Sequence, residues 1–88
     1  MFTSIEVWKR VDERTAIRYR CFRSTGTGKY SVQSADFYHL PLDRARIPTL
    51  DEQHIELFIE QPPDERSGSF DTIEEATRAG ESYRVFAY

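Results

Sequence analysis

The strongest constraint on the fold is a run over residues 15–23 in which two kinds of side chain alternate. A period of two is typical of a β-strand, because successive side chains point to opposite sides of a sheet. One side of this strand suits a hydrophobic core and carries Ile17, Tyr19 and Cys21. The other side carries two cations and an aromatic ring, from Arg18, Arg20 and Phe22. The chain is therefore expected to form a sheet with one apolar side and one cationic side.

Two further strands flank this run. Residues 5–11 alternate imperfectly, with Trp8 on the side opposite its apolar neighbours. Residues 29–38 form a third strand whose alternation breaks near Ser34, which indicates a β-bulge or a strand end. With the central strand at residues 14–23, we predict an antiparallel meander of three strands.

A glycine-rich segment separates the second strand from the third. Gly26 and Gly28 suit a hairpin loop that needs a positive φ. A phosphate-binding loop would need four residues between its glycines and a Ser or Thr directly after its lysine. Here one residue separates the glycines, and Tyr30 follows Lys29. The segment is therefore predicted to be a turn.

A first amphipathic helix is predicted after the strands. Thr49 and Glu52 have the spacing of a capping box, which predicts a helix over residues 50–61. The pattern at residues 55–59 equally fits a short strand, and the capping box decides in favour of the helix. Two prolines end this helix, and residues 64–69 are expected to form a polar loop.

A second helix is predicted over residues 72–79. Asp71 or Thr72 can cap its first turn. Gly80 stands where a left-handed residue commonly closes a helix. Residues 83–88 alternate once more and fit either a short fourth strand or a frayed end.

The predicted order β-β-β-α-α is that of an α+β fold, a three-stranded antiparallel meander followed by two helices packed on one face. An antiparallel sheet needs one face covered, and helices that follow it along the chain are the natural cover. A short C-terminal strand would add to the sheet. A chain of 88 residues has room for one domain, so residues 1–88 are assigned to a single unit.

Composition indicates a soluble protein of a reducing compartment. The single cysteine cannot form an internal disulfide, whereas small secreted domains usually need several. The first residues lack the basic start and apolar run of a signal peptide. No stretch approaches the roughly 20 apolar residues that span a bilayer. We therefore expect a cytoplasmic protein without a membrane partner.

Charge is distributed unevenly along the chain, whose formal net charge is −3. Residues 1–46 carry nine Lys and Arg against five Asp and Glu, whereas residues 47–88 carry three against ten. Acidic helices packed beside a basic sheet would explain this asymmetry. The same asymmetry can mark an interaction surface.

Patterns of catalytic or metal-binding residues are weak. Cys21, His39 and His54 lack the paired spacing of a zinc site. Ser34, Asp36 and His39 are close in sequence, but positions along one strand do not converge as a nucleophile with its base. We therefore expect no catalytic residue, no metal and no cofactor, and hence a non-enzymatic protein.

The cationic side of the sheet is the best candidate for a binding surface. Five residues are expected there on the solvent side: Trp8, Arg10, Arg18, Arg20 and Phe22. Trp and Arg are enriched in the hot spots of protein interfaces, so we hypothesise that the partner is another protein. Rings among arginines also suit the stacking of single-stranded nucleic acid, which the net negative charge disfavours. Otherwise Trp8 belongs to the core and the arginines only solvate the sheet. The oligomeric state is left open.

Overall fold

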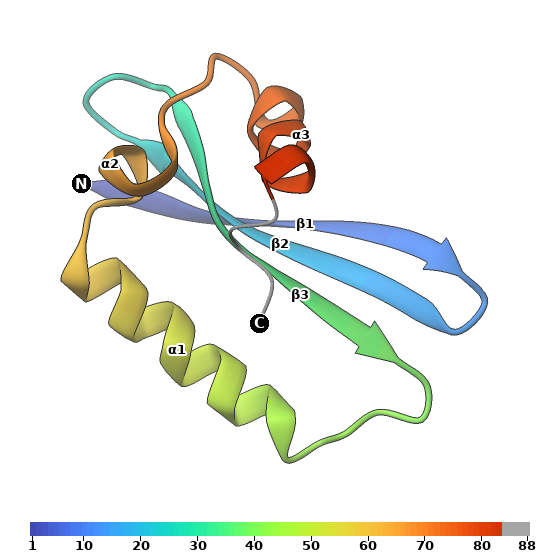
Figure 1. The fold of residues 1–88 in the computed structure, drawn as a ribbon. Helices are drawn as coiled ribbons and strands as arrows, with labels where there is room; N and C mark the ends of the chain where they lie inside the picture. Colours follow the sequence, from blue (N-terminus) through green and yellow to red (C-terminus); the bar gives the residue numbers. More distant parts are fainter. Residues whose placement is uncertain (84–88) are drawn as a thin grey trace.

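Three antiparallel strands form one sheet in the order β1-β2-β3 in the computed structural model, which describes residues 1–83 (Figure 1). Strand β1 spans Phe2–Asp12, β2 spans Thr15–Ser24 and β3 spans Tyr30–His39. The predicted meander is therefore confirmed. The first strand begins three residues earlier than the sequence pattern indicated, because Phe2, Thr3 and Ser4 also pair with β2.

The loop between β2 and β3 closes through backbone hydrogen bonds at its base. The Ser24 amide donates to the Lys29 carbonyl at 2.9 Å, and the Gly28 amide donates to the Ser24 carbonyl at 2.8 Å. Gly28 has a φ of +72°, a conformation that side chains with a Cβ rarely adopt. The predicted turn and the need for glycine at this position are confirmed.

A β-bulge interrupts the pairing of β2 with β3. Arg20 lies opposite Ser34, and Cys21 lies opposite Val32, so Gln33 is the extra residue. The predicted irregularity near Ser34 is therefore a bulge within a continuous strand. Its consequence is that the polar Gln33 lies against His54 of a helix, while Val32 stays in the hydrophobic core.

Helix α1 spans Arg46–Glu60 and begins four residues before the predicted start. Ala45 occupies the N-cap position, and no side chain caps the helix there. The predicted capping role of Thr49 is therefore wrong, since Thr49 lies inside the helix. The reason is that Pro48 does not end the preceding loop but sits in the first turn, where its missing amide donor costs nothing. The helical reading of residues 55–59 is confirmed.

Two shorter helices follow. Helix α2 spans Pro63–Ser67, in a segment that the sequence pattern assigned to a loop. Proline at the first helical position starts this single turn without losing a hydrogen bond. Helix α3 spans Ile73–Tyr83, and the Glu75 amide donates to Thr72 Oγ1 at 3.1 Å, which confirms Thr72 as its cap.

Helix α3 is longer than predicted. Gly80 was expected to follow the last turn, but it lies within the helix, because residues 81–83 continue the helical backbone. The expected C-terminal strand over residues 83–88 lies outside the described residues, apart from Tyr83 at the end of α3.

The helices cover both faces of the sheet, and the expectation that they share one face is wrong (Figure 1). Helix α3 places Ala76 against the apolar side, and α1 lies on the side of the arginines. The predicted core face is confirmed, since six residues form one buried cluster: Ile17, Tyr19, Cys21, Val32, Ala35 and Ala76. The second face can also be covered because α1 supplies the carboxylate of Asp51 to the arginines and the rings of His54 and Phe58 to Phe22.

Candidate interaction surface

The arginines of β2 are held by carboxylates from two other elements. Arg20 is only 6% exposed, and its Nε donates to Asp36 Oδ2 at 2.9 Å while its Nη2 donates to Asp51 Oδ1. Arg18 donates to the same Asp36 oxygen through Nη2 at 2.9 Å and through Nε at 3.2 Å. Two guanidinium groups therefore share one carboxylate from β3, with a second carboxylate from α1 beside it.

Asp36 is the centre of this charge network and is fully buried. Burial raises the pKa of Asp36, and the charge of Arg18 opposes that shift. A buried carboxylate is tolerated only when cations and hydrogen bonds compensate it, which Arg18 and Arg20 do here. The network thus fastens α1 to the sheet and leaves these cations little capacity to bind an external ligand.

Phe22 belongs to an aromatic cluster between the sheet and α1. Its ring stacks on His54 at a centroid distance of 5.4 Å and lies 4.6 Å from Phe58. Phe2 meets the ring of Phe58 edge-on at 5.8 Å. Gln33 Nε2 lies 2.8 Å from both Nδ1 and the carbonyl oxygen of His54, and burial lowers the pKa of that histidine.

The predicted exposure of the five site residues is therefore only partly right. Arg20 and Phe22 are buried beneath α1, and Arg18 retains 11% side-chain exposure. Their solvent-side placement is wrong, because Asp36 and Asp51 pair with the arginines and offset the cost of burying them. Trp8 and Arg10 do lie on the surface, at the part of the sheet that α1 leaves open.

Trp8 is 57% exposed and yet held in place by its neighbours. Its ring lies 5.8 Å from the ring of Tyr38, across the face of the sheet. The guanidinium carbon of Arg18 lies 5.6 Å from the Trp8 ring centroid and 5.4 Å from that of Tyr38. The arginine that the carboxylates fix therefore supports both rings by cation–π contact.

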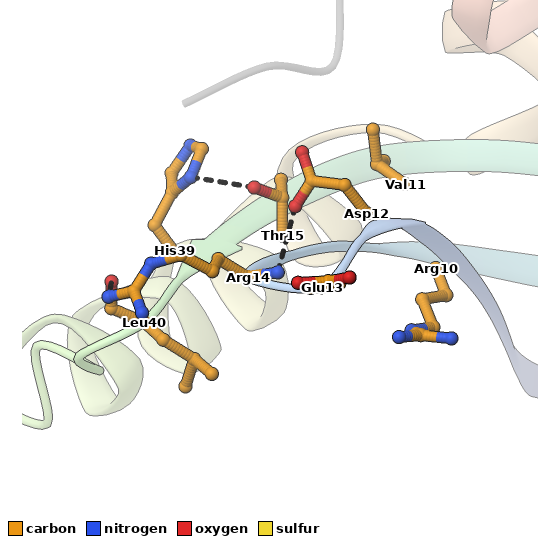
Figure 2. A pocket seen from close by; sticks show the side chains of 8 residues that line it. All are labelled: Arg10, Val11, Asp12, Glu13, Arg14, Thr15, His39 and Leu40. Carbon is orange, nitrogen blue, oxygen red and sulfur yellow. Dashed lines mark hydrogen bonds between the residues drawn. The ribbon is translucent and has the colours of Figure 1, made fainter.

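Two shallow depressions lie at this end of the sheet, and Trp8 lines the first of them. The first has a volume of about 370 Å³ and is lined in part by Trp8, Arg10, Tyr38, Leu40 and Leu42. The second, of about 780 Å³, surrounds the turn between β1 and β2 (Figure 2). Figure 2 shows that its polar groups bond to one another: Thr15 Oγ1 lies 3.0 Å from His39 Nδ1, and the Arg14 amide donates to Asp12.

The cysteine of the chain lies away from this surface. Burial raises the pKa of Cys21 to about 12, so its sulfur is a protonated thiol inside the core. Residues 1–83 contain no group of three potential metal ligands placed to share an ion, and none of the helices in that range could cross a bilayer. What the surface presents is apolar area beside a cation.

Sequence reasoning missed the partners that decide the site. Asp36 and Asp51 hold the arginines, and Tyr38 supports Trp8. A signal for Asp36 was present, because the meander places Trp8, Arg18 and Asp36 in one row across the strands. The contribution of α1 had no local signal, since it depends on which face the helix covers.

Comparisons with protein-family models, with curated proteins and with solved structures find no match. Any function proposed for this chain therefore rests on its own surface.

Proposed function

We propose that this chain is a protein-interaction domain that uses Trp8 as the anchor of its binding surface. The observation that carries this proposal is an indole more than half exposed and fixed between Tyr38 and Arg18. Buried Trp anchors dominate the energy of many protein interfaces. A ring that is already held in one position loses little conformational entropy when a partner covers it.

The surroundings of Trp8 support a protein partner. Val11, Leu40 and Leu42 at the same end of the sheet are each about half exposed, so apolar area extends beyond the indole. Arg10 is exposed and has no ion-pair partner within residues 1–83, which leaves a cation free at the rim. An apolar centre with a charged rim is the usual anatomy of a protein interface.

The alternative of a single-stranded nucleic acid has less support. Such binders track the phosphate backbone with unpaired cations beside their stacking rings. Arg18 and Arg20 are already neutralised by Asp36 and Asp51, which leaves few free cations near Trp8. Affinity for a nucleic acid would fall steeply with salt, and affinity through an apolar anchor would fall less.

The test compares Trp8→Ala with Ile59→Ala in affinity capture followed by quantitative mass spectrometry. Ile59 is 77% exposed on the outer side of α1 and is a matched apolar control away from the proposed surface. We expect Trp8→Ala to lose the captured proteins and Ile59→Ala to keep them, while both variants melt like the parent. Retention of every partner by a folded Trp8→Ala variant would remove the basis of the proposal.

A further inference from the structure

The two edge strands of the sheet differ in whether their outward backbone groups are hydrogen-bonded. The outer edge of β3 is covered, since Tyr30 and Phe70 exchange two backbone hydrogen bonds of 2.8 Å. Farther along that edge, Ser67 Oγ donates to the Val32 carbonyl at 2.6 Å, and Arg46 donates to the Phe37 carbonyl at 2.9 Å. The edge of β3 is therefore closed along most of its length.

The edge of β1 is open by contrast. Within residues 1–83, β1 is hydrogen-bonded to β2 alone, and its 11 residues present one free row of backbone donors and acceptors. A strand edge of this length is a template for pairing with another strand. Trp8 lies in the middle of it, so the anchor of the proposed surface and the open edge coincide.

We propose that the occupant of this edge is a second copy of the chain, paired antiparallel through β1 to form a continuous six-stranded sheet. This inference rests on the proposed function and names its partner. A twofold axis perpendicular to the sheet keeps each face on its own side, so a residue can pair only with one from the same face. Two paired residues are then separated by an even number of positions, so the residue midway between them lies on the axis, opposite the same residue of the second copy.

Charge selects one of these registers. With Trp8 on the axis, Glu6 of each copy lies opposite Arg10 of the other, which makes two ion pairs. With Glu6 on the axis the two glutamates face each other, and with Lys9 on the axis the two lysines do. A register centred on Val7 makes no ion pair, and one centred on Ile5 leaves Arg10 beyond the end of the partner strand.

The register centred on Trp8 also suits the rest of β1. Residues 6–10 pair regularly with β2, and the irregularity in β1 comes only after Arg10, so the segment that would pair is an undistorted strand. The Trp8 backbones meet at the axis, and each indole stays over Arg18 and Tyr38 of its own copy, beside the partner strand. Glu6 is half exposed and Arg10 is exposed, so both charges are accessible to a partner.

The first test is sedimentation of the full chain over a concentration series. We expect a monomer–dimer equilibrium in the parent, with a blue shift of the emission of the single tryptophan as concentration rises. Arg10→Glu sets like charges opposite each other at two places and should weaken the dimer by roughly tenfold or more. The matched control is Arg44→Glu, which makes the same charge change on the exposed loop before α1 and should sediment like the parent.

A complementary variant sharpens this test. Glu6→Lys alone should weaken the dimer in the same way, and an equal mixture of Glu6→Lys with Arg10→Glu should recover the dimer, because opposite charges then face each other at both places. Glu6 lies 3.8 Å from Arg18, so the fold of this variant is checked by its melting curve before mixing.

The register is tested separately by cysteine cross-linking under mild oxidation, which does not depend on the folding of Glu6→Lys. Trp8→Cys puts a thiol next to its own copy on the axis, and oxidation traps even the weaker dimer that this variant forms, whereas Lys9→Cys puts the thiol opposite Val7. We expect a disulfide dimer from the first variant and none from the second; Cys21 does not compete because it is buried.

Two results would overturn the inference: a parent chain that stays monomeric at every concentration, or cross-linking at Lys9→Cys without cross-linking at Trp8→Cys. A monomeric parent that still loses a different protein on Trp8→Ala would overturn the second copy as partner and leave the proposed function standing.

Discussion

Helices α3 and α1 close opposite faces of the same sheet with different chemistry. Beneath α3 the contacts are apolar, with Ala76 packed among residues such as Ile17 and Val32. Beneath α1 the contacts join the buried carboxylate of Asp36 to two arginines, with rings and amides beside them. The α3 face is stabilised by the removal of apolar side chains from water. The α1 face depends on ion pairs, and the loss of any partner leaves a buried charge without compensation.

This difference explains why charged residues on a strand are a poor guide to exposure. Apolar side chains gain from any apolar neighbour, so the α3 face tolerates many arrangements of similar volume. Buried charges need specific partners at specific distances, so the α1 face depends on the positions of Asp36 and Asp51. Each of the following changes is expected to affect one face more than the other.

The largest effect is expected from Asp36→Asn on the α1 face. The substitution leaves two buried guanidinium groups with Asp51, whose side chain is 51% exposed, as their nearest strong partner. Removal of one partner from a buried charge network costs about 4 kcal/mol, a large share of the stability of a small domain. Urea melts measure this loss.

The matched control for that variant is Asp71→Asn. Asp71 is 79% exposed and lies 3.7 Å from Lys29, an exposed pair that contributes little. The free energy of unfolding should stay within about 0.5 kcal/mol of the parent. Equal losses in the two variants would mean that the buried network does not hold α1.

On the α3 face, Ile17→Ala should destabilise the domain by about 3 kcal/mol through a cavity beneath α3. The free energy of unfolding from urea melts tests this value. The two faces are distinguished by amide hydrogen exchange, which is measured in α1 and in α3 for the variants Asp36→Asn and Ile17→Ala. Asp36→Asn should accelerate exchange in α1 first, and Ile17→Ala in α3 first; the reverse order would contradict the assignment of the two interfaces.

A smaller effect distinguishes the starts of the two helices. Thr72→Ala removes the side-chain cap of α3 and should cost about 1 kcal/mol. Thr49→Ala lies inside α1, where alanine favours the helix slightly more than threonine, so its change should be near zero. Thermal melts of the two variants decide the matter, and a loss of about 1 kcal/mol for Thr49→Ala would restore the capping box.

The smallest effect concerns pH and the α1 face. Burial lowers the pKa of His54 from its ordinary 6.5, so the folded state binds this proton less readily than the unfolded state. The stability associated with neutral His54 is present above pH 6.5 and is lost as the pH falls through the lower folded-state pKa. In urea melts over that range, the free energy of unfolding should fall as the pH falls. The His54→Asn variant should show a smaller slope of this free energy against pH, and the control His39→Asn should show the slope of the parent.

Much of the fold could be predicted from local patterns. The alternation in residues 15–23 located β2 and its core side, because the period of two is a property of the strand itself. Gly28 and Thr72 were identified by the backbone demands of a turn and of a helix start. The same kind of rule predicted Thr49 as the cap of α1, and that prediction was wrong because Pro48 and the residues before it begin the helix earlier.

The candidate site was less predictable, since exposure is not a local property. Trp8 and Arg20 lie on the same side of the sheet, but α1 covers one and leaves the other open. Their alternation with neighbouring residues is the same, so no pattern along the strand distinguishes them. The deciding partner, Asp51, comes from a helix that follows the whole sheet in sequence.

The sequence by itself determined three antiparallel strands, the two longer helices after them and the apolar side of β2, because periodicity and turn chemistry act between residues close along the chain. Only the tertiary structure decided that α1 and α3 lie on opposite faces and that Arg20 is buried whereas Trp8 is exposed. The physical reason is that the free energy of burying a charge depends on partners from elsewhere in the chain, and the carboxylates of Asp36 and Asp51 offset the cost of that burial.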